Sequence, residues 1–296
     1  MRKSFVRAGS RKTQDDTNDF LADSVPRYLT HAPVALSLRE LNRLLAIKRI
    51  EREHGRLHGM VLDVGCGDGF WWTFLDRRGR QIYGVDISSG EIDRARSILD
   101  HVVVADVSER PPFGGIEFDA IIGNCSLEHV PDIDGALRNL RRSAARDAQL
   151  VMFVPTPNWA LQGRTQHFLM NRWPRVGMSL GGALNGFFQH WHLYHHRVWA
   201  SILSSNGWKV RKVYGLGGER SEFLFRLFLP SGFVAFLVKT LTGSYPNRLL
   251  RYVPRRLLTP ITALFQHSLA TALVDPDHES AYEYVIVARL DSSHAA

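Results

Sequence analysis

Short apolar runs alternate with amphipathic stretches through most of the chain. Seven apolar runs, several of them rich in β-branched residues, predict buried strands at 60–65, 82–87, 101–107, 118–125, 150–156, 208–213 and 282–290. Apolar residues at helical spacing predict helices before and between them, at 38–53, 70–78, 88–99, 132–146 and 197–206. The alternation predicts right-handed crossovers and an α/β fold with a doubly wound, mainly parallel seven-stranded sheet.

Two helix starts carry a local signal. Ser37 with Glu40, and Ser88 with Glu91, have the Ser-x-x-Glu spacing of a capping box. In this motif each side chain accepts a hydrogen bond from the backbone amide of the other residue. Helices are therefore expected to begin at both serines.

The alternation also suggests how the chain is organised. We expect a flexible N-terminal tail over 1–32, a core over 33–215, and the final core strand with its tail over 277–296. The segment 216–276 interrupts the pattern just before the last strand. It is apolar and basic, which predicts a helical insertion.

Composition limits which compartment and which classes of partner are expected. The net charge of +8 favours an anionic partner, either a nucleic acid or a membrane surface. Cys66 and Cys125 are too few for a disulfide framework and are expected to be packing residues, which fits the cytoplasm. The first twenty residues are basic at the start but lack the continuous apolar core of a signal peptide.

The stretch VLDVGCGDG at 61–69 places three glycines directly after the first strand. At the carboxyl end of a parallel strand the chain must turn sharply, and a ligand approaches the backbone only where side chains are absent. Gly65, Gly67 and Gly69 therefore indicate a nucleotide-like ligand. Asp86 ends the next strand 19 residues after Gly67, where its carboxylate can accept hydrogen bonds from ribose hydroxyls.

The spacing argues against a dinucleotide. In G-x-G-x-x-G the third glycine would fall at position 70, which is Phe70 here. Asp63, just before the loop, would repel a pyrophosphate but suits a cationic amino-acid cofactor. The residues thus favour S-adenosylmethionine over NAD.

Four motifs, VLDVGCGDG, YGVDIS, VVADV and FDAIIGNCSLEHVPD, stand in this order along the chain. Together they resemble the class I S-adenosylmethionine-dependent methyltransferases over about 58–215, with a Rossmann-like fold and a final antiparallel strand. The resemblance implies that the three glycines approach the methionine and ribose, and that Asp86 holds the ribose. It further implies contacts to the cofactor amino group, the adenine and the methionine tail, from Asp63, from Asp106 with Val107, and from Asn124.

Methyl transfer from a sulfonium is a direct displacement, so alignment supplies much of the catalysis. Methylation of an oxygen also needs a proton removed, for which His129 and His192 are the candidate general bases. A structural loop histidine is the alternative reading of each. HWHLYHH at 190–196 has enough imidazoles for a metal, but nothing in the pattern demands one, so no metal is predicted.

The loop after the fourth strand bears on the acceptor. It reads Asn124–Cys125–Ser126–Leu127 and lacks the Pro-Pro-Tyr that marks family members methylating base or glutamine amino groups. The pattern resembles enzymes that act on small molecules, quinones, sugars or lipids. Nucleic acid is therefore an unlikely partner by resemblance.

The insertion carries a disproportionate share of the charge. Residues 221–270 hold a net +5 together with large apolar side chains. Its charge-free run 227–238 would be about 18 Å long as a helix, short of a hydrocarbon core of about 30 Å. Two strands of one sheet flank it, so it must cross a membrane an even number of times, and spanning is not expected. An interfacial segment on an anionic leaflet, a cap and a dimer interface all remain open.

The function predicted from the sequence is methyl transfer from S-adenosylmethionine to a small or lipid-linked acceptor near the inner, cytoplasmic face of the membrane. Candidate acceptors are a quinone precursor, a glycan or a lipid. Two alternatives stay open: a nucleic-acid methyltransferase that uses the positive charge, and a non-catalytic binding or assembly module that keeps the cofactor fold.

Overall fold

The chain divides into two compact units. The computed structural model describes residues 2–157, 159–160, 164–243, 245–269 and 273–291. One unit joins Met1–Arg49 to Gly217–Leu273, and the other joins Ile50–Leu216 to Val274–Ala296. The insertion before the last strand therefore forms a unit with the N-terminal segment.

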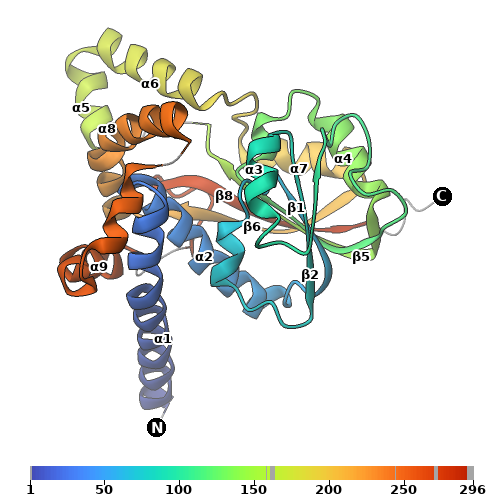
Figure 1. Ribbon diagram of the computed structural model, residues 1–296, viewed down its shortest axis with the longest axis horizontal. Helices are drawn as coiled ribbons and strands as arrows, with labels where there is room; N and C mark the ends of the chain where they lie inside the picture. Colours follow the sequence, from blue (N-terminus) through green and yellow to red (C-terminus); the bar gives the residue numbers. More distant parts are fainter. Residues whose placement is uncertain (1, 158, 161–163, 244, 270–272, 292–296) are drawn as a thin grey trace. The chain divides into compact units, whose positions relative to one another are not determined.

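The larger unit is built on one sheet, with strand order β3-β2-β1-β4-β5-β8-β6-β7 (Figure 1). The strands are β1 (Gly59–Val64), β2 (Arg80–Asp86), β3 (His101–Val104), β4 (Phe118–Asn124), β5 (Ala144–Pro155), β6 (Trp208–Gly217), β7 (Leu273–Val274) and β8 (Ala281–Leu290). β1 pairs in parallel with β2 and β4, and parallel pairing continues to β3 and β5. β8 runs antiparallel to β5.

This topology confirms the predicted doubly wound, mainly parallel α/β sheet with an antiparallel closing strand. The described sheet has eight strands rather than seven, because the two residues of β7 add a short edge strand beside β6. Two residues are too few to give a periodic sequence signal.

Helices and 3-10 turns connect these strands: η1 (Phe70–Phe74), α3 (Ser89–Ala95), η2 (Leu127–His129), α4 (Ile133–Arg142), α5 (Arg164–Arg172), α6 (Pro174–Phe188) and α7 (His196–Ser205). Leu137 of α4 and Trp199 of α7 are fully buried in one core cluster with Leu62 and Ile121. α4 and α7 therefore cover the face of the sheet to which Leu62 points.

Two local predictions failed and one held. Ser88 caps α3, and its Oγ accepts a hydrogen bond from Glu91 N at 3.3 Å, as predicted. Ser37 instead lies inside α2 (Val34–His54) and donates through Oγ to the Ala32 carbonyl at 3.0 Å, so its capping box was wrong. After β1 the chain forms only η1, because Gly69 enters it at φ 73° and Leu75 is already extended.

The smaller unit is helical. It contains α1 (Arg2–His31), most of α2, α8 (Glu219–Thr242), η3 (Pro246–Tyr252), η4 (Arg255–Leu258) and α9 (Thr259–Ser268). The prediction of a flexible tail was wrong: α1 contacts α9 and η3, and Leu21, Val25 and Leu29 are fully buried. These three residues are spaced by four and form one helical stripe, which the polar residues before them obscured.

α8 supplies the helical insertion that the apolar and basic composition predicted. Of the described helices, it is the one long and apolar enough to cross a membrane by length and composition, and 22% of its most apolar stretch is buried within the protein. Such a helix is weak evidence for spanning. The topological expectation of an even number of crossings is unaffected by it.

Candidate functional site

The glycine loop lies at the carboxyl end of β1. Gly65, Gly67 and Gly69 adopt φ values of 69°, 54° and 73°, the left-handed region that favours glycine. The amides of Gly65 and Cys66 both donate to the Val85 carbonyl, at 2.8 and 3.1 Å. The loop is thereby folded back over the end of β2.

The three glycines do different work. A Cβ on Gly65 would lie 2.4 Å from Ser126 Cβ, and one on Gly69 would lie 2.9 Å from Leu99 Cγ. A Cβ on Gly67 would meet nothing within 4 Å. Packing against neighbouring side chains therefore requires Gly65 and Gly69, whereas the space that a ligand could enter lies at Gly67.

Asp86 joins this loop to the start of α3. Its Oδ2 accepts a hydrogen bond from Gly67 N at 3.0 Å, and its Oδ1 accepts one from Ser88 N at 2.8 Å. A carboxylate has about four acceptor positions, so two backbone bonds leave capacity for hydroxyl donors. The residue that the sequence placed on a ribose thus lies directly beside the open glycine.

Asp63 is 5% exposed, on the strand that leads into the loop. The indole Nε1 of Trp72, on η1, donates to Asp63 Oδ2 at 2.7 Å, and Trp72 is itself fully buried. The sequence analysis did not identify Trp72 as a site residue. The sequence feature that could have indicated Trp72 is its position: it lies just after the glycine loop, nine residues beyond Asp63.

The loop after β3 is stabilised by side chains around Asp106 and Val107. Ser108 donates to Asp106 Oδ1 from its amide at 2.8 Å and from its hydroxyl at 2.6 Å. Asn139 of α4 donates through Nδ2 to the carbonyls of Val107 and Ser108, at 3.0 and 2.9 Å. Asn139 is a second supporting residue that sequence reasoning missed, since it lies more than 30 positions downstream.

The end of β4 is drawn over the end of β1. Asn124 is half-buried at the last position of β4, and Cys125 follows in the left-handed region at φ 51°. Ser126 donates through its hydroxyl to the Val64 carbonyl. This contact brings Asn124 to the same sheet edge as the glycine loop.

Cys66, inside the glycine loop, lacks the properties of a nucleophile. Burial raises the pKa of the Cys66 thiol, and the carboxylates of Asp63 and Asp86 raise it further. The thiol therefore stays protonated near neutral pH, and its Sγ lies where a Cβ on Gly84 would fall, at 2.7 Å. This supports a packing role for Cys66.

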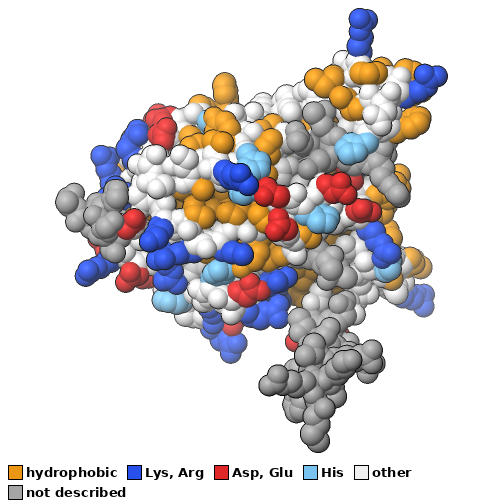
Figure 2. Space-filling view, turned by 180° about the vertical axis from the view of Figure 1, so that it is seen from behind, with side chains coloured by type: hydrophobic (Ala, Val, Ile, Leu, Met, Phe, Trp, Pro, Cys, Tyr) orange, Lys and Arg blue, Asp and Glu red, His pale blue; other side chains and the backbone are white. Residues whose placement is uncertain are grey.

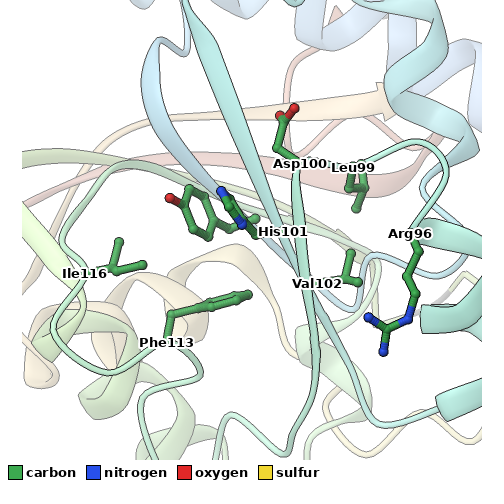
Figure 3. A pocket seen from close by; sticks show the side chains of 8 residues that line it. Arg96, Leu99, Asp100, His101, Val102, Phe113 and Ile116 are labelled. Atoms are coloured by element: carbon green, nitrogen blue, oxygen red, sulfur yellow. The ribbon is translucent and has the colours of Figure 1, made fainter.

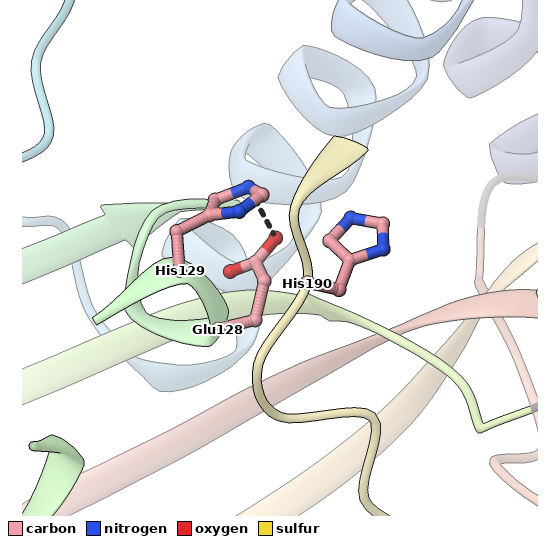
Figure 4. Close-up of side chains that lie close together, drawn as sticks. All are labelled: Glu128, His129 and His190. Atoms are coloured by element: carbon pink, nitrogen blue, oxygen red, sulfur yellow. Dashed lines mark ion pairs between the residues drawn. The ribbon is translucent and has the colours of Figure 1, made fainter. Parts of the chain in front are cut away.

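His129 lies in a cluster with Glu128 and His190, shown in Figure 4. His129 Nε2 is 3.6 Å from Glu128 Oε1, and the two imidazole rings are stacked with centroids 5.0 Å apart. The Glu128 side chain is fully buried, whereas that of His129 is 37% exposed. Of the two predicted bases, His129 thus has solvent access beside a carboxylate.

His192 is held by the surrounding chain. Its Nε2 lies 2.8 Å from the Val130 carbonyl, and its Nδ1 lies 3.2 Å from the Tyr194 hydroxyl. Both ring nitrogens have a protein partner, and the residue is 8% exposed. The contacts suit a histidine that ties residues 190–194 to the loop after η2.

A pocket of about 450 Å³ lies elsewhere in the same unit (Figure 3). It is lined by Tyr83, Arg96, Leu99, Asp100, His101, Val102, Phe113 and Ile116. Tyr83 stacks on His101 at a centroid distance of 4.4 Å, three positions before Asp86 on β2. None of the predicted cofactor or catalytic residues lines this pocket.

Comparison with known proteins adds a family assignment. A family model described as "Methyltransferase domain" matches residues 28–213, more than half of the chain. An uncharacterised methyltransferase of Mycobacterium tuberculosis (strain ATCC 25618 / H37Rv) is 37% identical over 86 residues, 27% of this chain and 42% of that protein. The malonyl-(acyl-carrier protein) O-methyltransferase of Halorhodospira halophila is 30% identical over 146 residues, 46% of this chain and 47% of that protein.

The chain therefore spans less than half the length of these curated relatives. Among solved structures, the geranyl diphosphate C-methyltransferase from Streptomyces coelicolor A3(2) is 15% identical, with a TM-score of 0.49 over 83% of this chain and 75% of that one. That structure contains Mg2+, geranyl-S-thiolodiphosphate and S-adenosyl-L-homocysteine.

Proposed function

Because the chain belongs to the methyltransferase-domain family of class I, S-adenosylmethionine-dependent enzymes, we propose that it transfers a methyl group from S-adenosylmethionine to a small or lipid-linked acceptor. The observation that carries the proposal is the arrangement at Gly67. Its amide is 3.0 Å from the Asp86 carboxylate, and the space where a Cβ would lie is open. A nucleoside can approach the backbone there while its ribose hydroxyls donate to Asp86.

The charge around the loop suits this cofactor. The carboxylates of Asp63, Asp86 and Asp68 each raise the pKa of the Cys66 thiol. The electrostatic field at the loop is therefore negative. A cofactor with a sulfonium and an ammonium group is attracted by such a field, whereas a pyrophosphate is repelled. The donor set therefore fits S-adenosylmethionine better than NAD.

The protein's own groups would position the reactants. Bound S-adenosylmethionine supplies an electrophilic methyl group on its sulfonium. Asp106 and Val107, stabilised by Ser108 and Asn139, would meet the adenine, and Asn124 would face the methionine tail. Since direct displacement depends on alignment, these residues contribute by holding the methyl group in line with the acceptor.

On the acceptor side we assign His129 to assist loss of the acceptor proton. It is the more exposed of the two predicted histidines and follows β4, where an acceptor would enter. His192 has both ring nitrogens engaged, and we propose that it positions the loop rather than exchanging protons.

A lipid-linked acceptor is supported by the surface of the smaller unit. Apolar side chains of α8 are exposed along its length: Phe223, Leu227, Phe233, Val234, Phe236, Leu237 and Leu241. The 3-10 turns that follow expose Leu249, Tyr252 and Leu257 among Arg248, Arg251, Arg255 and Arg256. Figure 2 shows apolar side chains reaching the surface beside Lys and Arg on one face of the protein.

Apolar surface mixed with arginine is the composition of a segment that lies on an anionic leaflet. We therefore propose peripheral contact with an anionic membrane at its cytoplasmic face. A cap or a dimer interface would bury the same apolar side chains, whereas an anionic leaflet would also attract each arginine electrostatically.

The test is calorimetric titration of the purified chain with S-adenosylmethionine and S-adenosylhomocysteine, with NAD as the ligand control. Micromolar binding is expected, and Asp86→Ala is expected to weaken it ten- to a hundredfold, or about 1.4 to 2.8 kcal/mol. Asp93→Ala is the matched control, because Asp93 is an exposed carboxylate beyond Asp86 that pairs with Arg96 at 3.5 Å. Folded protein that binds neither methionine ligand would overturn the cofactor assignment and favour the assembly module.

A further inference from the structure

We propose that Glu128, His129 and His190 bind one divalent transition-metal ion. The sequence predicted no metal, because it could not place His190 beside residues more than 60 positions upstream. The structure brings these three side chains together. A carboxylate oxygen and one nitrogen of each imidazole all lie within 4.8 Å of one another (Figure 4).

Backbone contacts fix the two segments that supply the ligands. The Glu128 carbonyl accepts hydrogen bonds from Trp191 N at 3.0 Å and from His192 N at 3.1 Å. The chain just after His190 is therefore attached to the residue that supplies the carboxylate. Preorganised ligands of this kind reduce the ordering that binding would otherwise require.

His129 also has the outer contact typical of a metal-binding imidazole. Its Nδ1 lies 3.1 Å from the Gln189 carbonyl, which is the usual partner of a ring N–H. That bond fixes the tautomer and leaves Nε2, the nitrogen nearest Glu128, to face the ion. His190 stacks on Phe188 with its ring planes 7° apart, and this limits its rotation.

The charge at the cluster gives a reason for a cation. The Glu128 side chain is fully buried, and a buried carboxylate is costly unless it is paired or coordinates a metal. A divalent ion held by Glu128 and the two imidazoles would coordinate that carboxylate directly. Two imidazoles and one carboxylate suit Zn²⁺, Fe²⁺, Mn²⁺ or Co²⁺ rather than Ca²⁺ or Mg²⁺, which prefer all-oxygen sites.

Binding needs a small contraction of the cluster. Metal–ligand bonds of about 2.0–2.2 Å place tetrahedral ligand atoms about 3.5 Å apart, so donors now up to 4.8 Å apart must approach one another. His129 can supply that movement, because its side chain is partly exposed.

A second cluster in the same unit has a similar composition but different surroundings. His195 and His196 lie 3.3 and 2.9 Å from Asp277 Oδ1, and Arg197 lies 3.8 Å from Asp277 Oδ2. The Asp277 side chain is 53% exposed, so water already solvates its charge. It has little to gain from a metal, which makes it a matched comparison.

The use of the ion rests on the proposed function. Three protein ligands leave at least one position for an acceptor oxygen, and a bound cation lowers the pKa of a hydroxyl. The hydroxyl proton would pass to solvent. The oxygen–carbon bond then forms as the sulfur–carbon bond breaks, which releases S-adenosylhomocysteine. His129 would thus assist proton loss as a ligand.

The test uses the full chain after treatment with a chelator, titrated with ZnCl₂ by calorimetry and with CoCl₂ by absorbance. One ion per chain is expected. His129→Asn and His190→Asn should each weaken zinc binding at least tenfold, and Glu128→Gln should do so where it folds. The double variant His195→Asn/Asp277→Asn should bind as the unmodified chain does.

S-adenosylmethionine is titrated into the same samples, so that failure of the metal site and failure of the cofactor site are distinguished. Protein that binds S-adenosylmethionine but no zinc or cobalt overturns the metal site alone. Zinc binding that survives His129→Asn and His190→Asn, or that is lost in the double variant, also overturns it. Zinc binding without S-adenosylmethionine binding supports the metal site and counts against the proposed function.

Discussion

Trp72 donates a hydrogen bond of 2.7 Å from its indole nitrogen to the buried carboxylate of Asp63. This bond joins the end of β1 to η1, and the glycine loop is the chain between them. The carboxylate that we propose to face the cofactor amino group is therefore oriented by a tryptophan.

Trp72→Phe should weaken S-adenosylmethionine binding and destabilise the fold. Phenylalanine keeps an aromatic ring, although a smaller one, and loses the donor to a buried carboxylate. The lost hydrogen bond alone is expected to lower the unfolding free energy by about 1–3 kcal/mol. Trp71→Phe is the matched control, since no hydrogen bond from the buried Trp71 Nε1 is found within the described residues. Denaturant unfolding and ligand titration of both variants measure the effect. Equal losses for the two tryptophans would contradict the role of the Asp63 bond.

Comparing Gly67→Ala with Gly79→Ala should distinguish the loss of ligand space from the effect of backbone strain. Alanine at φ 54° is strained by about 1–2 kcal/mol, and its methyl group would also enter the open space beside Asp86. Gly79→Ala imposes a similar strain at φ 69°, likewise with nothing within 4 Å of the added Cβ, but away from the loop.

We expect both glycine variants to lose similar stability in thermal unfolding. Only Gly67→Ala should reduce affinity for S-adenosylhomocysteine, by tenfold or more. If the two variants bind the ligand equally well, the cofactor does not lie against Gly67.

Local spacing was enough to predict the sheet, the glycine loop and the acidic residue that ends β2. Gly67 and Asp86 are the clearest case, because each is marked by its place at a strand end and their contact follows from parallel pairing. What spacing could not supply are partners set by tertiary packing. Asn139 reaches Val107 from 32 positions away, and Glu128 meets His190 across a segment with no periodic pattern.

The N-terminal helix was missed for the same physical reason. α1 has a weakly apolar sequence overall, and its order depends on contacts made by the other end of the chain. Gln266 of α9, for example, donates to the Asn18 carbonyl at 2.9 Å. A helix stabilised by packing rather than by propensity is invisible until its partner is placed.

Breaking the buried ion pair between Glu51 and Arg80 should destabilise the larger unit strongly. The side chain of Arg80 is 1% exposed and that of Glu51 is 15% exposed. Burial raises the pKa of Glu51 and lowers that of Arg80 despite their mutual attraction, so desolvation outweighs the pairing for each group. Glu51→Gln leaves a buried guanidinium with less compensation, at a cost of about 3–5 kcal/mol.

The double variant Glu51→Leu/Arg80→Met should recover most of that loss, because two apolar side chains can replace a buried ion pair at little net cost. Asp93→Asn, which removes an exposed pair, is expected to leave the unfolding free energy unchanged within error. Urea denaturation of all three variants measures this. A double variant no more stable than Glu51→Gln would show that the pair is net stabilising.

Glu51 also predicts a pH dependence with a definite sign. Because its pKa in the folded state lies above the ordinary value of 4.5, the folded protein binds this proton more tightly than the unfolded chain does. The contribution of Glu51 to stability should therefore fall as pH rises from about 4.5 through the raised pKa. Glu51→Gln should lack this component, and the difference between the two pH profiles of unfolding free energy isolates it.

The arginines of η4 should strengthen attachment of the smaller unit to an anionic membrane. Arg255 and Arg256 are exposed next to Leu257, which is 63% exposed. A basic residue near an anionic surface contributes about 1 kcal/mol, so Arg255→Ser/Arg256→Ser should weaken binding by about 2 kcal/mol, or roughly thirtyfold. Sedimentation with vesicles of phosphatidylcholine and phosphatidylserine measures this.

Lys209→Ser/Arg211→Ser removes the same charge from exposed positions on β6 and should change vesicle binding little, because charge alone does not anchor a surface that lacks apolar side chains. The Leu241 side chain is 87% exposed. Leu241→Ser should weaken vesicle binding even at a high salt concentration, where charge attraction is screened. If the η4 double variant and the β6 double variant lose vesicle affinity equally, the attraction depends on net charge alone. A chain that ignores vesicles and instead dimerises in solution would assign the exposed apolar side chains of α8 to a protein interface.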